Sequence, residues 1–195
     1  MNTIEALATK NQQRGWEIIE ESSIYAIWES IGAEVFLVGS LPNGLMMKKR
    51  DIDVHVYTES VNITDSFTAI TRLAEKIDIY ELEYRNLLDT EEECVEWHAT
   101  FYDVNRKLWK FDIIHIRKGS LFDGHVERVT GRIKELLTPK NRRTILQLKY
   151  DTPETEQIMG IEYYKAVIQD GVQTYEELIE WRKENPANRM IEWKP

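Results

Sequence analysis

The sequence predicts an α/β domain over about residues 1–120, followed by a helical region over residues 121–195. In the first region, short apolar runs with strand character alternate with segments of helical spacing, whereas the second region shows helical spacing only. The charge divides in a similar place. The first 124 residues hold 13 Lys or Arg and 22 Asp or Glu, and the remainder hold 12 of each. We therefore expect the boundary near residues 118–125.

The first segment, Thr3–Ile31, has helical spacing and is predicted to be a helix with a break near Gly15, ended by Gly32. The apolar run at 33–39 predicts a buried strand, and a turn follows at 41–44. Further strands are expected at 51–57, 79–84, 95–102 and 108–116, with a helix at 65–77 capped by Thr64 and a hairpin turn at 103–107.

The helical region contains three recognisable segments. Apolar residues recur at helical spacing over 126–136 and again over 158–168. Thr174 and Glu177 form a capping box that opens a last helix, which Pro186 ends.

The composition is typical of a soluble globular protein, with 42% hydrophobic and 30% charged residues among 195. Cys94 is the only cysteine, so no internal disulfide is possible, and we expect a reducing, cytoplasmic location. No signal peptide and no membrane helix are expected. The net charge of −9 argues against general nucleic-acid binding. The net charge does not exclude a small anionic ligand that is bound by a metal ion and a few neighbouring basic side chains.

Two carboxylates lie two residues apart in a predicted strand. Asp51 and Asp53 would share one face of the strand, about 6–7 Å apart along the chain, while Ile52 and Val54 face the core. Carboxylates so placed repel each other unless water surrounds them or a cation lies between them. Their hard oxygen ligands suit Mg²⁺. The alternative interpretation is a solvated strand edge.

A third carboxylate, Asp112, stands alone in a strongly apolar predicted strand, where an isolated charge is costly to bury. If this strand neighbours the Asp51 strand, three carboxylates could hold two metal ions roughly 3.5–4 Å apart. Two alternatives remain open. Asp112 could instead pair with a buried Arg or Lys, and Asp103 is a rival third carboxylate, although its neighbours favour a turn-capping role.

Gly39 and Ser40 end the first predicted strand. Gly39 would let a phosphate approach the backbone closely, and Ser40 could donate its hydroxyl and amide. The run Lys48-Lys49-Arg50, above all Lys49 and Arg50, could neutralise phosphate charge, although a solvated loop is the commoner role of such a run. His55 shares the face of the two carboxylates, so it either lines the site or lies on the surface.

These residues together resemble the DNA polymerase beta-like nucleotidyltransferase superfamily. The resemblance rests on Gly39-Ser40, ten intervening residues, Asp51-Ile52-Asp53 and the later Asp112. It covers about residues 33–116 and implies a mixed sheet with helices, followed by a helical part. It implies that Ser40 contacts the β- and γ-phosphates, that all three aspartates ligate Mg²⁺, and that Asp112 also helps to activate an acceptor hydroxyl.

The resemblance further implies transfer of a nucleoside monophosphate from a nucleoside triphosphate, with release of pyrophosphate. We expect ATP as the donor, two Mg²⁺ ions, and a hydroxyl of a small molecule as the acceptor. One alternative is a catalytically inactive binding module that keeps the fold. Another is a toxin–antitoxin component that acts through a protein partner.

Overall fold

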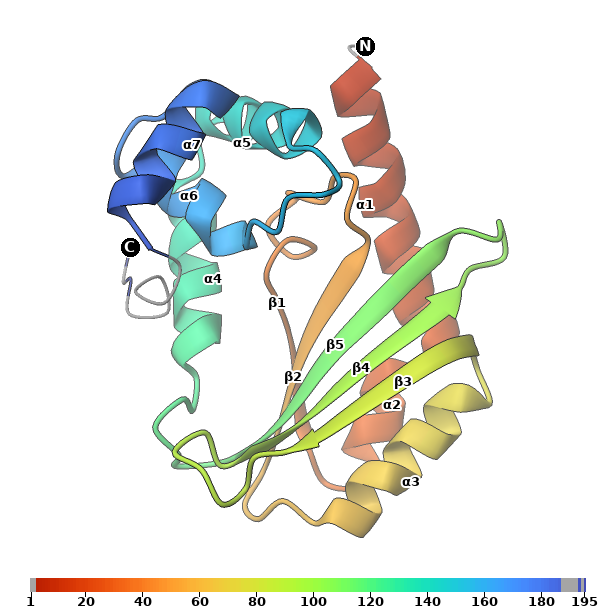
Figure 1. Cartoon of the computed structure of the whole chain (residues 1–195). Coiled ribbons are helices and arrows are strands. Elements are labelled where there is room, and N and C mark those ends of the chain that lie inside the picture. The colour runs from red at the N-terminus through yellow and green to blue at the C-terminus, as the bar shows by residue number, and fades with distance from the viewer. Residues whose placement is uncertain (1–2, 187–192, 194) are drawn as a thin grey trace.

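The computed structural model describes residues 3–186, 193 and 195. In this part of the chain, seven helices and five strands follow one another (Figure 1). They are α1 (Thr3–Ser22), α2 (Ile24–Glu29), β1 (Glu34–Val38), β2 (Asp51–Thr58), α3 (Ile63–Ala74), β3 (Asp78–Asn86), β4 (Cys94–Tyr102), β5 (Leu108–Arg117), α4 (His125–Leu136), α5 (Pro139–Asp151), α6 (Gly160–Ile168) and α7 (Tyr175–Glu184).

The five strands form one mixed sheet in the order β1-β2-β5-β4-β3. Only β2 and β5 run parallel, and the other neighbours are antiparallel. The parallel register sets Asp53 opposite Asp112, as the site hypothesis requires. The predicted class, a mixed α/β sheet with flanking helices, is confirmed.

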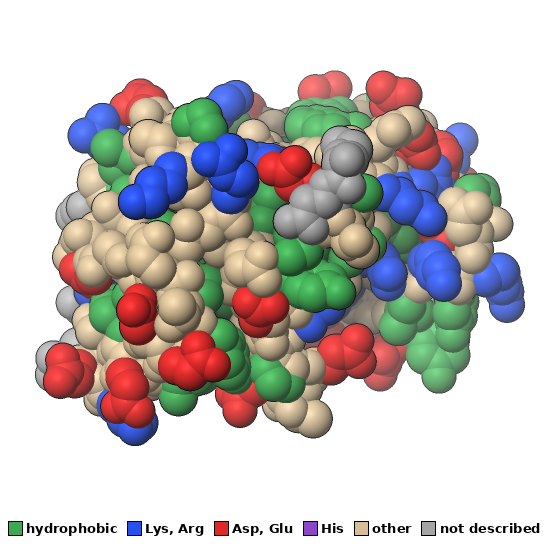
Figure 2. Space-filling view, turned by 90° about the horizontal axis from the view of Figure 1, so that it is seen from above, with side chains coloured by type: hydrophobic (Ala, Val, Ile, Leu, Met, Phe, Trp, Pro, Cys, Tyr) green, Lys and Arg blue, Asp and Glu red, His purple; other side chains and the backbone are tan. Residues whose placement is uncertain are grey.

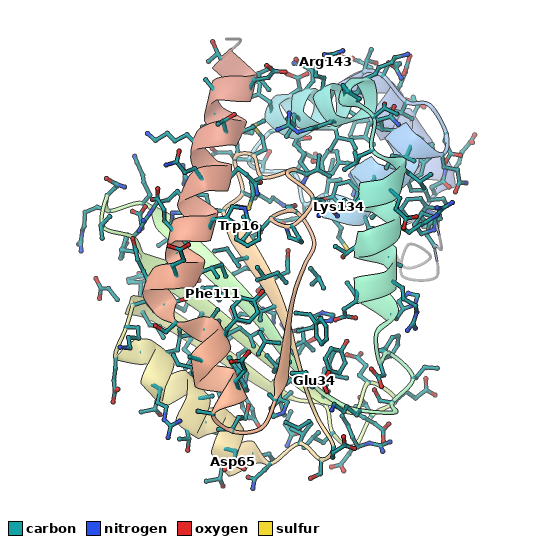
Figure 3. All side chains as sticks on the ribbon, turned by 180° about the vertical axis from the view of Figure 1, so that it is seen from behind. Trp16, Glu34, Asp65, Phe111, Lys134 and Arg143 are labelled. Carbon is teal, nitrogen blue, oxygen red and sulfur yellow. The ribbon has the colours of Figure 1, made fainter. Side chains whose placement is uncertain are left out.

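One face of the sheet packs on α1, α2 and α3 around the main core. Side chains along β4 and β5 alternate between buried and partly exposed, so one set, including Trp97, Phe111 and Ile113, is removed from water. Seen from behind, α1 crosses this face (Figure 3). The opposite set of side chains, which includes Asp112, is left for the functional face.

A second core lies among the later helices, which gather beside β1 and β2 in Figure 1. It joins Val129 and Ile133 of α4 to Ile145 of α5 and Leu178 of α7, with Leu45 contributed by the β1–β2 loop. The loop is therefore held between the sheet and the helices. No described helix is both long and apolar enough to cross a membrane.

Some sequence-based predictions of local structure were wrong. The first helix breaks at Ser23, which has a φ of 53°, and not at Gly15, which stays helical. The absence of a side chain at Gly15 lets α1 approach the loop, because a Cβ there would lie 2.8 Å from Leu41 Cδ1. Asn62, not Thr64, caps α3 by accepting hydrogen bonds from two backbone N–H groups.

Candidate nucleotide and metal site

A cavity of about 710 Å³ lies between the open face of the sheet and the helical region. Its floor comes from the ends of β1, β2 and β5, and its walls come from α4, α6 and the loop before α6. All three aspartates of the predicted triad line it, together with Gly39, Ser40 and Lys49. Arg50 is not among the lining residues, so the structure does not bring it to the cavity.

Asp53 lies directly against the backbone of Gly39. A Cβ added to Gly39 would lie 2.3 Å from Asp53 Oδ2, and the residue has a φ of +71°. Both observations favour glycine at this position. The sequence predicted that a phosphate would approach the backbone of Gly39 closely, and in this structure the carboxylate of Asp53 makes that approach.

Burial and mutual repulsion perturb the two carboxylates of β2. Burial, with the charges of Asp112 and Asp51, raises the pKa of Asp53 to about 7. Burial also raises the pKa of Asp51, partly offset by the cation of Lys110. A divalent cation would relieve this repulsion, so the donor set fits Mg²⁺ chemistry.

Asp112 is held by two neighbours that the sequence did not single out for this role. Its Oδ1 accepts a hydrogen bond from His98 Nδ1, and its Oδ2 lies 2.9 Å from Lys110 Nζ. Asp112 thus has a lysine partner, but Lys110 is 36% exposed and is not the buried Arg or Lys that the alternative interpretation required. Among the residues that the structure describes, no three His, Cys, Asp or Glu side chains are grouped so as to hold one ion as they stand.

Ser40 lies within a network that sequence reasoning missed. Lys149 of α5 donates hydrogen bonds to Ser40 Oγ at 2.9 Å, to the carbonyl of Leu45 at 3.0 Å and to the Tyr164 hydroxyl at 3.1 Å. The Tyr164 hydroxyl also lies 2.9 Å from Ser40 Oγ. A cation and two hydroxyls therefore converge beside the Gly39-Ser40 turn, which suits a phosphate group.

The other candidate residues divide between the site and the scaffold. His55 lines the cavity, as one interpretation proposed, and its Nδ1 lies 2.8 Å from Glu127 Oε1 of α4. Asp103, the rival third carboxylate, accepts hydrogen bonds from the backbone N–H groups of Asn105 and Lys107. It also pairs with Arg14, so its turn-capping role is confirmed.

No protein-family model and no curated protein matches the chain. Solved structures do share its fold. A GLD-2/RNP-8 complex is 11% identical, with a TM-score of 0.55, covering 93% of this chain and 66% of that one. Cid1, described as having RNA terminal uridylyl transferase activity, is 16% identical, with a TM-score of 0.56, covering 81% and 46%. A Cid1 poly(U) polymerase structure bound to MgATP is 16% identical, with a TM-score of 0.55, covering 81% of this chain and 49% of that one.

The present chain spans between about half and two thirds of the length of these matched proteins. At such low identities the likeness establishes the fold alone. The chain therefore shares the fold of these solved structures, in agreement with the mixed sheet and helices that the sequence resemblance implied.

Proposed function

We propose that this protein is a Mg²⁺-dependent nucleotidyltransferase. The observation that carries the proposal is the pair Asp51 and Asp53, whose pKa values are raised by burial. The pair adjoins a Gly39-Ser40 turn to which Lys149 brings a cation. Buried carboxylates with perturbed pKa values in a cavity are typical of functional sites.

In the proposed reaction, the oxygen of an acceptor hydroxyl attacks the α-phosphorus of a nucleoside triphosphate. The bond from that phosphorus to the bridging oxygen breaks, pyrophosphate leaves with the electron pair, and the hydroxyl proton passes to Asp112. Bound Mg²⁺, two ions in our proposal, would supply charge neutralisation at the phosphates. Asp51, Asp53 and Asp112 would hold the metal, while Ser40, Lys149 and Lys49 would bind the β- and γ-phosphates.

We propose ATP as the donor and the hydroxyl of a small molecule as the acceptor. The cavity, at about 710 Å³, is within the ~300–1,000 Å³ of small-ligand sites. The face shown in Figure 2 carries Lys and Arg interspersed with Asp and Glu, without a continuous basic surface for a polyanion. An RNA 3′-hydroxyl is the second candidate, because the similar Cid1 structure is described as an RNA terminal transferase.

The test is transfer of label from each α-³²P nucleoside triphosphate with Mg²⁺. Three acceptor arms would be used: a pool of hydroxylated small molecules, a single-stranded RNA with a free 3′-hydroxyl, and a protein extract. We expect transfer in the small-molecule arm and none with Asp53→Asn. Transfer to RNA alone would contradict the acceptor class, and transfer to a protein would favour the toxin–antitoxin alternative. Nucleotide binding without transfer in any arm would favour an inactive binding module.

A further inference from the structure

The open face of the sheet carries a row of charged side chains that leads from its outer strand to Asp112. Arg85 of β3 lies opposite Glu96 of β4, with 3.7 Å between Nη1 and Oε2. His98 Nε2 lies 3.6 Å from the same Glu96 oxygen. His98 in turn lies opposite Asp112 in the antiparallel register of β4 and β5. The proposed function uses Asp112 but assigns no role to the residues behind it.

The two oxygens of Asp112 have different partners. Since an ionised carboxylate can only accept hydrogen bonds, His98 Nδ1 must carry the hydrogen that it shares with Oδ1. Lys110 Nζ is a cation 2.9 Å from Oδ2. The Lys110 side chain remains 36% exposed, whereas those of His98 and Asp112 are 23% and 19% exposed. The contact to His98 is thus the more enclosed of the two.

This arrangement resists a specific motion. Asp53 lies opposite Asp112 on the neighbouring strand, and the charges of the two carboxylates repel. Without a partner on β4, Asp112 could turn toward solvent on the open face. A hydrogen bond to Oδ1 fixes the rotamer and leaves further acceptor sites on Oδ2, because a carboxylate offers about four lone-pair positions.

We infer that His98 is a positioning residue of the transfer site, which anchors Asp112 Oδ1 so that Oδ2 stays available for the cation and for the acceptor proton. This inference rests on the proposed function. Lys110 Nζ lies 2.9 Å from Oδ2 and occupies one of its acceptor positions, so a second acceptor position on Oδ2 remains. The histidine contacts neither the nucleotide nor the reacting atoms.

The test compares His98→Ala, His98→Asn and His98→Gln in the full chain. The amide nitrogen of Asn can replace Nδ1, whereas that of Gln reaches toward the position of Nε2. Removing such an outer partner of a ligand typically costs about 10–100-fold in activity or metal affinity. We expect a loss of kcat of about that size for Ala and Gln, with recovery for Asn. The KM for the nucleotide should change little, because Ser40 and Lys149 lie on other elements.

Glu83→Gln is the matched control, since Glu83 faces His98 from the opposite strand on the same side of the sheet. It should leave kcat unchanged. Binding of Mn²⁺ to the protein without nucleotide, measured as the loss of the electron paramagnetic resonance signal of free Mn²⁺, provides a readout besides turnover. The affinity should fall about 10-fold for Ala and Gln and recover for Asn.

Several outcomes would overturn the inference. If His98→Ala keeps both the kcat and the Mn²⁺ affinity of the wild type, the histidine does not position Asp112. If His98→Asn loses as much kcat and Mn²⁺ affinity as His98→Gln, the role of His98 is steric and the inference fails. If the wild type binds Mn²⁺ in an Asp53-dependent way but transfers no nucleotide, the proposed function fails while the Mn²⁺ series still tests His98. A wild type without Mn²⁺ binding or transfer overturns both.

Discussion

At the scale of the residue, Asp53 is the most perturbed member of the site. Burial and the neighbouring carboxylates raise the pKa of Asp53 from its ordinary value to about 7. The stability that its protonated form contributes is present in full below the unfolded pKa and is lost as the pH rises through about 7. The metal-free protein therefore carries a destabilising charge at alkaline pH, which a bound cation would remove.

Asp53→Asn should consequently stabilise the metal-free protein at pH 8, by roughly 2–4 kcal/mol. The difference from the wild type should vanish near pH 4, where both side chains are neutral. Thermal unfolding in chelator across pH 4–9 measures this. Mg²⁺ should reduce the difference in stability between the two proteins at pH 8, because it stabilises the wild type alone. A difference that does not change with pH would show that the carboxylate is not perturbed.

Gly39 offers a second test at the same scale. Gly39→Ala places a methyl group against Asp53 Oδ2 and puts a residue with a side chain at a positive φ. The substitution should lower the free energy of unfolding by about 1–3 kcal/mol and abolish Mg²⁺-dependent nucleotide binding. Gly32→Ala is the control. Gly32 has a φ of +80° but nothing within 4 Å of an added Cβ, so it should share the backbone cost and keep the binding. Equal binding by the two variants would contradict the assigned contact.

At the scale of the element, α5 is the helix that sequence reasoning missed. Its start was marked, because Thr138 caps it and Pro139 stands in its first turn. Its apolar residues Ile145, Leu146 and Leu148 lie close together in the sequence, so they do not form the long stripe of apolar residues that predicts an amphipathic helix. The helix brings Lys149 to Ser40 across 109 positions of sequence, which no local pattern could show.

Lys149→Ala should raise the KM for the nucleotide about 10–100-fold, because a charge-assisted hydrogen bond contributes about 1.5–3 kcal/mol. The value of kcat should change less. Lys140→Ala, at an exposed position of the same helix, is the matched control and should behave like the wild type. Steady-state kinetics over a range of nucleotide concentrations separate the two effects. If both lysine variants show the same KM, α5 does not contribute to the phosphate site.

At the scale of the whole molecule, much of the sheet could be predicted because β-strand alternation places Asp51 and Asp53 on one face opposite Ile52 and Val54. From the sequence, Asp112 was expected beside them only if its strand neighboured the Asp51 strand. The parallel register of β2 and β5 confirms that pairing. The partners of Asp112 could not be predicted, because His98 meets it only through strand pairing. Long-range pairings of this kind are set by tertiary packing.

The most direct test of the central claim is calorimetric titration of the protein with a non-hydrolysable ATP analogue, with and without Mg²⁺. Wild type, Asp53→Asn and Lys140→Ala would be compared at pH 8. A site built from buried carboxylates and a phosphate-binding turn predicts binding that requires Mg²⁺, disappears in Asp53→Asn and persists in Lys140→Ala. Binding that is equally strong without Mg²⁺, or that survives in Asp53→Asn, would contradict the nucleotidyltransferase site.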